Sequence, residues 1–191
     1  MKLTRPILLV GSESDCPDIV YATGFRAPDP SVLFCAEDRR ILVVSPLEQG
    51  RAVRAAAEWT RAHGTRCSLD VVTPEQLGLS PRRRGRLDAW AGAVLKRAGV
   101  RRVAVPAFFP HGIAEALRQK GIRVVVSNDA LMSWRAVKSV EEVKKIQESQ
   151  QAAVIAMRAA MALIASAEIT RRGGLAIRGR ALTSEMVRRL I

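Results

Sequence analysis

Short runs of apolar residues recur through the first 126 residues, and stretches with helical spacing separate most of them. The runs cover residues 7–10, 32–35, 41–45, 69–72, 103–106 and 122–126. They are apolar rather than alternating, which is typical of strands covered on both faces. A polar turn at residues 36–40 joins the second run to the third and indicates a hairpin.

Three stretches between these runs have the composition and spacing of helices. Residues 46–64 open with Pro46 and close with Gly64, which suit the first turn and the stop of a helix. Residues 81–98 place their apolar side chains on one face, and residues 111–120 precede a further glycine stop. The order of elements predicts an α/β fold with a mixed sheet flanked by helices, a hairpin first and βαβ units after it.

Residues 135–169 read as one long helix that opens a second domain. Ser139 and Glu142 have the spacing of a capping box, in which each side chain bonds to the backbone amide of the other residue. From residue 139 to 169 the helix would be about 46 Å long, at about 1.5 Å per residue. Its second half is apolar on almost every side and therefore needs a partner surface.

The two domains are expected at residues 1–134 and 135–191. Thr183 is the predicted N-cap of a last helix, with Glu185 in its first turn. The sequence stops at Ile191 after about two turns of that helix, with no stop signal. We therefore expect the second domain to be incomplete, as in the front part of a longer protein or a truncated gene product.

The charge balance raises the question of a nucleic-acid partner. Lys and Arg number 31 against 18 Asp and Glu, a net charge of +13. The basic residues are dispersed along the chain, and only 82–84 form a run. Aromatic residues make up 4%, which leaves few rings to stack on bases, and no zinc-finger, RNP or KH pattern occurs. We expect a solvated, arginine-rich surface and no nucleic-acid partner.

Cysteine usage and the absence of a targeting signal predict a cytoplasmic protein. Cys16, Cys35 and Cys67 form no CxxC pair, and they predict reduced thiols rather than disulfides or a zinc site. The N-terminus lacks the features of a signal peptide. The most apolar run, residues 152–167, is shorter than a membrane span and contains Arg158.

The residues of the chain offer few candidates for chemistry. His63 falls at a predicted helix end and His111 at a strand-to-helix junction, and neither has a catalytic partner at a recognisable spacing. No glycine-rich phosphate loop and no HExxH pattern occurs. The carboxylates suit turns and caps better than acid–base pairs; they are Asp15, Asp18, Asp29, Glu37, Asp38, Glu141 and Glu142. We assign no catalytic, cofactor-binding or metal-binding residue.

Two local motifs carry a resemblance to a known family. Residues 21–25 read Tyr-Ala-Thr-Gly-Phe, and residues 135–143 read Arg-Ala-Val-Lys-Ser-Val-Glu-Glu-Val. The pair resembles the creatinase/prolidase/Xaa-Pro aminopeptidase family, in which an N-terminal α/β domain carries Y-x-T-G-F and the linker to the catalytic domain reads R-x-x-K-S-x-x-E-[IV]. Both motifs occur here in the same order, and the resemblance covers the whole chain.

The resemblance implies the front part of a proline-specific metallopeptidase with a "pita-bread" catalytic domain. Such a domain binds two divalent metals, commonly Mn, Co or Zn, through two Asp, one His and two Glu, and the metals activate a water that attacks the amide before proline. No residue of this chain matches those ligands. The resemblance thus implies an inactive chain with a role in substrate access and in a homodimer contact, and a peptide substrate only for the full-length protein.

Two other readings stay open at this point. One is a standalone basic binding module for nucleic acid, whose affinity would fall steeply with salt. The other is a pseudo-enzyme that dimerises through the apolar face of the long helix.

Overall fold

The computed structural model describes residues 5–63, 67–127 and 135–191. These residues form two compact units, Met1–Ala136 and Val137–Ile191, which are described separately. The helix stop expected at Gly64 lies outside the described residues. The interpretation of the second unit as the start of a catalytic domain stays a prediction.

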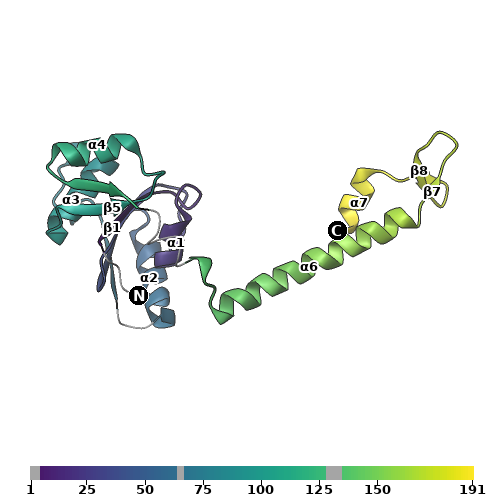
Figure 1. The fold of residues 1–191 in the computed structure, drawn as a ribbon, viewed down its shortest axis with the longest axis horizontal. Helices are drawn as coiled ribbons and strands as arrows, with labels where there is room; N and C mark the ends of the chain where they lie inside the picture. Colours follow the sequence, from purple (N-terminus) through teal and green to yellow (C-terminus); the bar gives the residue numbers. More distant parts are fainter. Residues whose placement is uncertain (1–4, 64–66, 128–134) are drawn as a thin grey trace. The chain divides into compact units, whose positions relative to one another are not determined.

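A six-stranded mixed sheet is the centre of the first unit (Figure 1). Its strands lie in the order β4-β3-β2-β1-β5-β6. The bounds are β1 Ile7–Gly11, β2 Ser31–Cys35, β3 Arg39–Val43, β4 Ser68–Val72, β5 Arg102–Val105 and β6 Arg123–Val126. Strand β2 runs antiparallel to both β1 and β3, and the other three pairs are parallel. The predicted hairpin is therefore β2–β3, and all six predicted strands are present.

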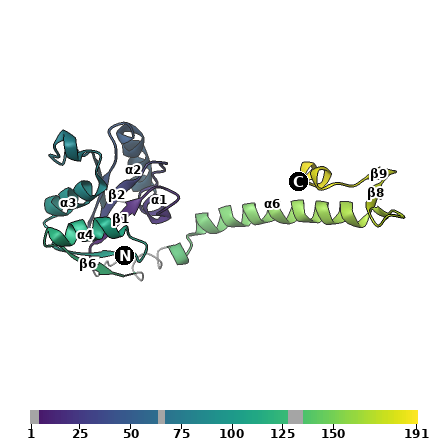
Figure 2. The same cartoon turned by 90° about the horizontal axis from the view of Figure 1, so that it is seen from above.

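Helices cover both faces of this sheet (Figure 2). On one face, Leu8 and Phe34 pack with side chains of α3 (Leu87–Ala98) and α4 (His111–Gln119). On the other face, Leu9 and Leu33 pack with side chains of α1 (Pro17–Thr23) and α2 (Gln49–His63). Successive residues of a strand point to opposite faces, so each central strand contributes to two apolar cores.

The expectation that strands are covered on both faces is correct for the centre of the sheet and wrong at its edges. Strands β1 and β2 are buried throughout. In β4, Ser68 and Asp70 are exposed, and in β6 Arg123 and Val126 are exposed. Strands β4 and β6 lie at the two edges of the sheet, and each has only one neighbouring strand. Their polar residues Ser68, Asp70 and Arg123 are exposed to solvent.

The helix expected at residues 81–98 begins later than predicted. Pro81–Arg83 form only a short 3-10 helix, η1, and α3 starts at Leu87. Residues 82–86, which precede α3, hold four arginines and Gly85. Positive side chains oppose the dipole at a helix N-terminus, and glycine has a low helix propensity. Gly99 ends α3 in the left-handed conformation, as expected of a glycine stop.

The second unit consists of a long helix, a small sheet and a terminal helix. Helix α6 spans Val140–Ala165 and α7 spans Ser184–Leu190. Between them, β7 (Glu168–Ile169), β8 (Leu175–Ile177) and β9 (Arg180–Ala181) form an antiparallel sheet. The helix predicted over residues 135–169 is therefore shorter: residues 137–139 are not helical, and α6 ends at Ala165 because Ile169 pairs with Leu175 in the sheet. Thr183 caps α7 as predicted.

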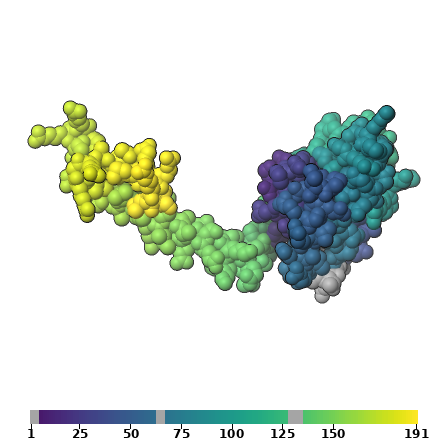
Figure 3. Space-filling model, turned by 180° about the vertical axis from the view of Figure 1, so that it is seen from behind, coloured from purple at the N-terminus to yellow at the C-terminus, as the bar shows by residue number. Residues whose placement is uncertain are grey.

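Helix α6 exposes a large apolar surface. None of its residues is buried, and in the space-filling view the side chains of this unit stand at the surface (Figure 3). Met157 and Met161 are each 63% exposed, and Ile155 is 62% exposed. The apolar side chains of α6 are therefore left exposed, in line with the expectation that this helix needs a partner surface.

The capping box at the start of α6 is present and provides the first test. The Ser139 hydroxyl accepts from the Glu142 amide at 3.2 Å, and the Ser139 amide donates to the Glu142 carboxylate at 2.7 Å. Replacing Ser139 with Ala should cost about 1 kcal/mol of helix stability. We expect first-turn amides of α6 to exchange with solvent about fivefold faster, measured by NMR hydrogen exchange. Unchanged exchange at the Glu142 amide would contradict a role for the cap, and α7 amides serve as the internal control.

Candidate functional site

The Tyr-Ala-Thr-Gly-Phe motif forms the end of α1 and the turn that follows it. Gly24 adopts a left-handed φ of 69°, and its amide donates to the Val20 carbonyl at 2.7 Å. The Thr23 hydroxyl donates to the Ile19 carbonyl at 2.6 Å and accepts from the Phe25 amide at 3.2 Å. The Phe25 ring is buried. The motif therefore ends a helix and directs the chain into the core.

Arg40 of β3 anchors this turn from the side. Its guanidinium donates to the Ala22 carbonyl at 2.8 Å and lies over the Trp59 ring, 4.3 Å from the ring centroid. The Trp59 indole in turn donates to the Tyr21 carbonyl at 3.3 Å. Burying a charged guanidinium is costly unless it has partners, and here the Ala22 carbonyl and the face of the Trp59 ring both stabilise its positive charge. The carbonyls at the end of α1 are thus held by side chains of β3 and α2.

The second motif contacts α1, the helix whose end carries the first motif, through an ion pair. Arg135 lies 3.3 Å from the Asp18 carboxylate in the first turn of α1. The Asp18 side chain is only 11% exposed, whereas that of Arg135 is 44% exposed. An acidic side chain in the first turn is also favoured by the helix dipole. Residues 117 positions apart are therefore joined where the first unit ends.

The loop after β1 shows turn chemistry rather than a ligand cradle. The Ser12 hydroxyl donates to the Asp15 carboxylate at 2.6 Å, and the Ser12 amide lies 3.3 Å from the same oxygen. These bonds lower the pKa of Asp15 from its ordinary value. The Asp15 carboxylate therefore accepts hydrogen bonds from its own turn, as expected from the sequence.

Among the described side chains, His111 and the three cysteines form no group that could hold a metal ion. His111 is the exposed first residue of α4, and His63 is the last residue of α2. Burial raises the pKa of Cys16 to about 11, with a further contribution from the Asp18 charge, and raises the pKa of Cys35 to about 12. Both thiols are core residues with very little thiolate at neutral pH.

The described residues do not fit a metal centre. Over residues 5–63, 67–127 and 135–191, no group of three or more His, Cys, Asp and Glu side chains could hold a metal ion. No metal-dependent step is therefore assigned to these residues. No helix in the described part of the chain is long and apolar enough to cross a membrane.

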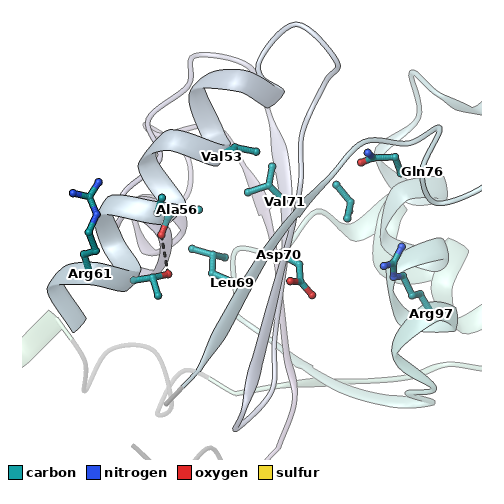
Figure 4. A pocket seen from close by; sticks show the side chains of 11 residues that line it. Val53, Ala56, Arg61, Leu69, Asp70, Val71, Gln76 and Arg97 are labelled. Carbon is teal, nitrogen blue, oxygen red and sulfur yellow. Dashed lines mark hydrogen bonds between the residues drawn. The ribbon is translucent and has the colours of Figure 1, made fainter. Parts of the chain in front are cut away.

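A shallow groove of about 820 Å³ lies between α2 and the edge strand β4 (Figure 4). Val53 and Ala56 of the helix face Leu69 and Val71 of the strand across it. The Thr60 hydroxyl donates to the Ala56 carbonyl at 2.8 Å and is thus bound within its own helix. The groove offers apolar contact and an open strand edge, but no nucleophile paired with a base.

Sequence reasoning missed α1 and the ion pair between Asp18 and Arg135. Helix α1 has a detectable signal, since Pro17 opens it and Gly24 closes it in the pattern favoured for helix ends. The Asp18–Arg135 pair has no local signal, because it depends on a contact between distant parts of the chain. The roles of Thr23 and Arg40 likewise follow only from their partners in space.

Replacing Gly24 with Ala tests the motif turn. A Cβ at this position would lie 3.5 Å from the Trp59 Cβ, an ordinary contact, so the cost comes from the left-handed φ. We expect a loss of about 1 kcal/mol in the free energy of unfolding. The measurement is urea unfolding followed by tryptophan fluorescence, since Trp59 and Trp90 lie in the first unit.

Gly50→Ala is the matched control. Gly50 lies in α2, and a Cβ there meets no atom within 4 Å. Alanine favours a helix, so this change should leave stability unchanged or raise it. Equal effects of Gly24→Ala and Gly50→Ala would show that the left-handed turn is not required.

The structure is similar to solved prolidases and Xaa-Pro peptidases. It aligns with a prolidase from Pyrococcus horikoshii OT3 at a TM-score of 0.56 and 17% identity, over 97% of this chain and 43% of that one. It aligns with an X-Pro aminopeptidase from Thermotoga maritima MSB8 at 0.58 and 16%, over 97% and 44%. It aligns with an Xaa-Pro dipeptidase from Bacillus anthracis at a TM-score of 0.60 and 14% identity, over 84% of this chain and 39% of that one.

These similarities concern structure. No protein-family model matches the sequence, and no curated protein matches it. The chain spans less than half the length of the three solved structures. The fold implied by the two motifs is confirmed: this chain has the fold of the front part of the prolidases and Xaa-Pro aminopeptidases, a creatinase-like α/β domain followed by a long helix.

Proposed function

We propose that this chain is the front part of a proline-specific metallopeptidase of the Xaa-Pro aminopeptidase and prolidase kind. The observation that carries the proposal is the alignment over 97% of the chain, which includes both units, with a prolidase and an X-Pro aminopeptidase. The motifs at residues 21–25 and 135–143 support it independently, since the resemblance rests on the sequence and not on the fold. In this proposal, residues 135–191 are the opening helices of the catalytic domain.

The metal chemistry of the proposed enzyme belongs to residues beyond those described. The described residues hold no group that fits a metal, so two divalent ions, Mn, Co or Zn, would be held elsewhere in a full-length protein. The peptide substrate would then be bound only by that protein. The first unit would shape access to the substrate site and contribute a dimer contact.

The reading frame of the gene beyond codon 191 tests this proposal directly. We expect it to encode two Asp, one His and two Glu in a second half of the catalytic domain. The protein extended through that frame should hydrolyse an Xaa-Pro dipeptide with added Mn²⁺ or Co²⁺, whereas the 191-residue chain should show no turnover above a chelator-treated blank. Turnover by the 191-residue chain would overturn the placement of the metals, and an extended protein without the ligand set would overturn the peptidase.

The dimer contact has its own test. The exposed apolar face of α6 favours self-association of this chain, because burying Met157 and Met161 removes apolar area from water. We expect light scattering to show a dimer, and Met157→Glu with Met161→Glu to give a monomer. Gln147→Glu with Gln151→Glu adds the same charge to exposed positions of the same helix and should leave the dimer intact. A monomeric wild-type chain, or equal effects of both variants, would contradict this contact.

A further inference from the structure

The positive charge of the first unit is concentrated in its second half. Residues 79–127 carry 11 Lys and Arg against 2 Asp and Glu, whereas residues 1–78 carry 9 against 10. More than half of the basic residues of the first unit thus lie in one contiguous stretch, which comprises η1, α3, β5, α4 and β6. Within one compact unit, this asymmetry gives one side a positive field.

The two acidic residues of this stretch are already paired. Asp88 accepts from the Arg86 guanidinium at 3.0 and 3.1 Å, and Glu115 lies 3.5 Å from Arg118. The Arg86 guanidinium lowers the pKa of Asp88 below its ordinary value, so this carboxylate stays charged and paired at neutral pH. The charge of Lys120 also acts on Asp88, but two acids can offset only two of the eleven positive charges of the stretch.

Two grooves run across α3 among those cations. One has a volume of about 540 Å³ and extends toward η1, and the other has a volume of about 460 Å³ and extends toward the start of β6. Both are lined by Gly92, Lys96 and Lys120. Because they share these residues, the two grooves adjoin each other, and we call them together the α3 track.

Gly92 gives the α3 track its central cation. The Lys120 side chain lies across α3 at this point, with its ammonium 3.4 Å from the Asp88 carbonyl oxygen. A Cβ at residue 92 would lie 3.0 Å from the Lys120 Nζ, tighter than most real contacts. The absence of a side chain at residue 92 therefore lets Lys120 stand where the two grooves meet.

The α3 track has an apolar lining with basic residues along it. The apolar side chains are half-buried; they include Leu77, Leu79, Ala93, Val100 and Ile122. The basic residues are exposed; they are Arg83, Lys96, Arg97, Arg101 and Lys120. No acidic and no aromatic side chain of the described residues lines either groove.

This lining favours one class of partner. A nucleic-acid strand gains affinity in such grooves from bases stacked on aromatic rings, which the α3 track does not offer. A phosphate backbone would also leave Leu77 and Leu79 without an apolar partner. A peptide with alternating carboxylate and aliphatic side chains meets both needs, because its acids reach the basic residues while its aliphatic groups cover the apolar ones.

We propose that the α3 track is a docking site for an extended acidic peptide segment of a partner protein. The proposal is independent of peptidase activity, since it uses only residues of the first unit. The cations steer the peptide to the track and hold it in register, and the apolar contacts favour a protein segment over other polyanions.

Fluorescence anisotropy with the full 191-residue chain tests the proposal. The probe is a labelled ten-residue peptide of alternating Glu and Leu, and the comparison probes are the same peptide with Gln for Glu and a single-stranded oligonucleotide. We expect the Glu–Leu peptide to bind most tightly. Lys96→Glu with Lys120→Glu should weaken it at least tenfold, because each reversal replaces an attraction with a repulsion.

Arg54→Glu with Arg188→Glu is the matched control, since it changes the net charge equally at exposed positions outside both grooves. This variant should change the affinity by less than twofold. Circular dichroism of each variant verifies that it is folded, and Leu79→Gln, which keeps all charges, should weaken the Glu–Leu peptide severalfold. If both charge variants weakened binding of the Glu–Leu peptide equally, the effect would come from net charge alone, and the α3 track would not be the docking site. Tighter binding of the oligonucleotide, lost in the Lys96 and Lys120 variant, would assign the track to nucleic acid and overturn the peptide partner.

Discussion

The structure of the first unit depends on the burial of its central strands on both faces. Leu8, Leu9 and Leu33 are fully buried, and they point alternately into two separate cores. A sheet with two apolar faces is stable only if helices cover both, which dictates the α/β/α layering. Apart from the buried Asp18 and Arg40, the charged residues of the first unit lie mainly outside its two apolar cores, and the basic residues of the α3 track are among these exposed ones.

The residues of the two motifs have structural roles, because they end one helix and begin another. Gly24 and Thr23 end α1, Arg40 holds the carbonyl at that end, and Ser139 and Glu142 start α6. Arg135, the first residue of the second motif, pairs with Asp18 in the first turn of α1. Such roles tie specific side chains to backbone groups, and these constraints are compatible with a shared fold at only 14–17% identity to the solved peptidases.

The two proposals for this chain differ in whether they need further residues. The proposed peptidase needs metal ligands that the described residues do not supply, whereas the α3 track is complete within the first unit. The apolar face of α6 is a different kind of surface, because it lacks this concentration of cations and exposes long aliphatic and thioether side chains.

Local pattern determined the elements, and tertiary contacts determined the sites. The six strands, the β2–β3 hairpin, the capping box and the Thr183 cap follow from periodicity and from hydrogen bonds within a few residues, which a sequence displays directly. The early end of α6 and the exposure of β4 and β6 depend on strand pairing, whereas the late start of α3 has a local cause in the arginines and Gly85 that precede it. The Asp18–Arg135 pair and the convergence of Lys96 with Lys120 depend on distant residues meeting across the fold. A sequence records the charge of those residues, but only the packing of helices on the sheet decides which charges share a surface.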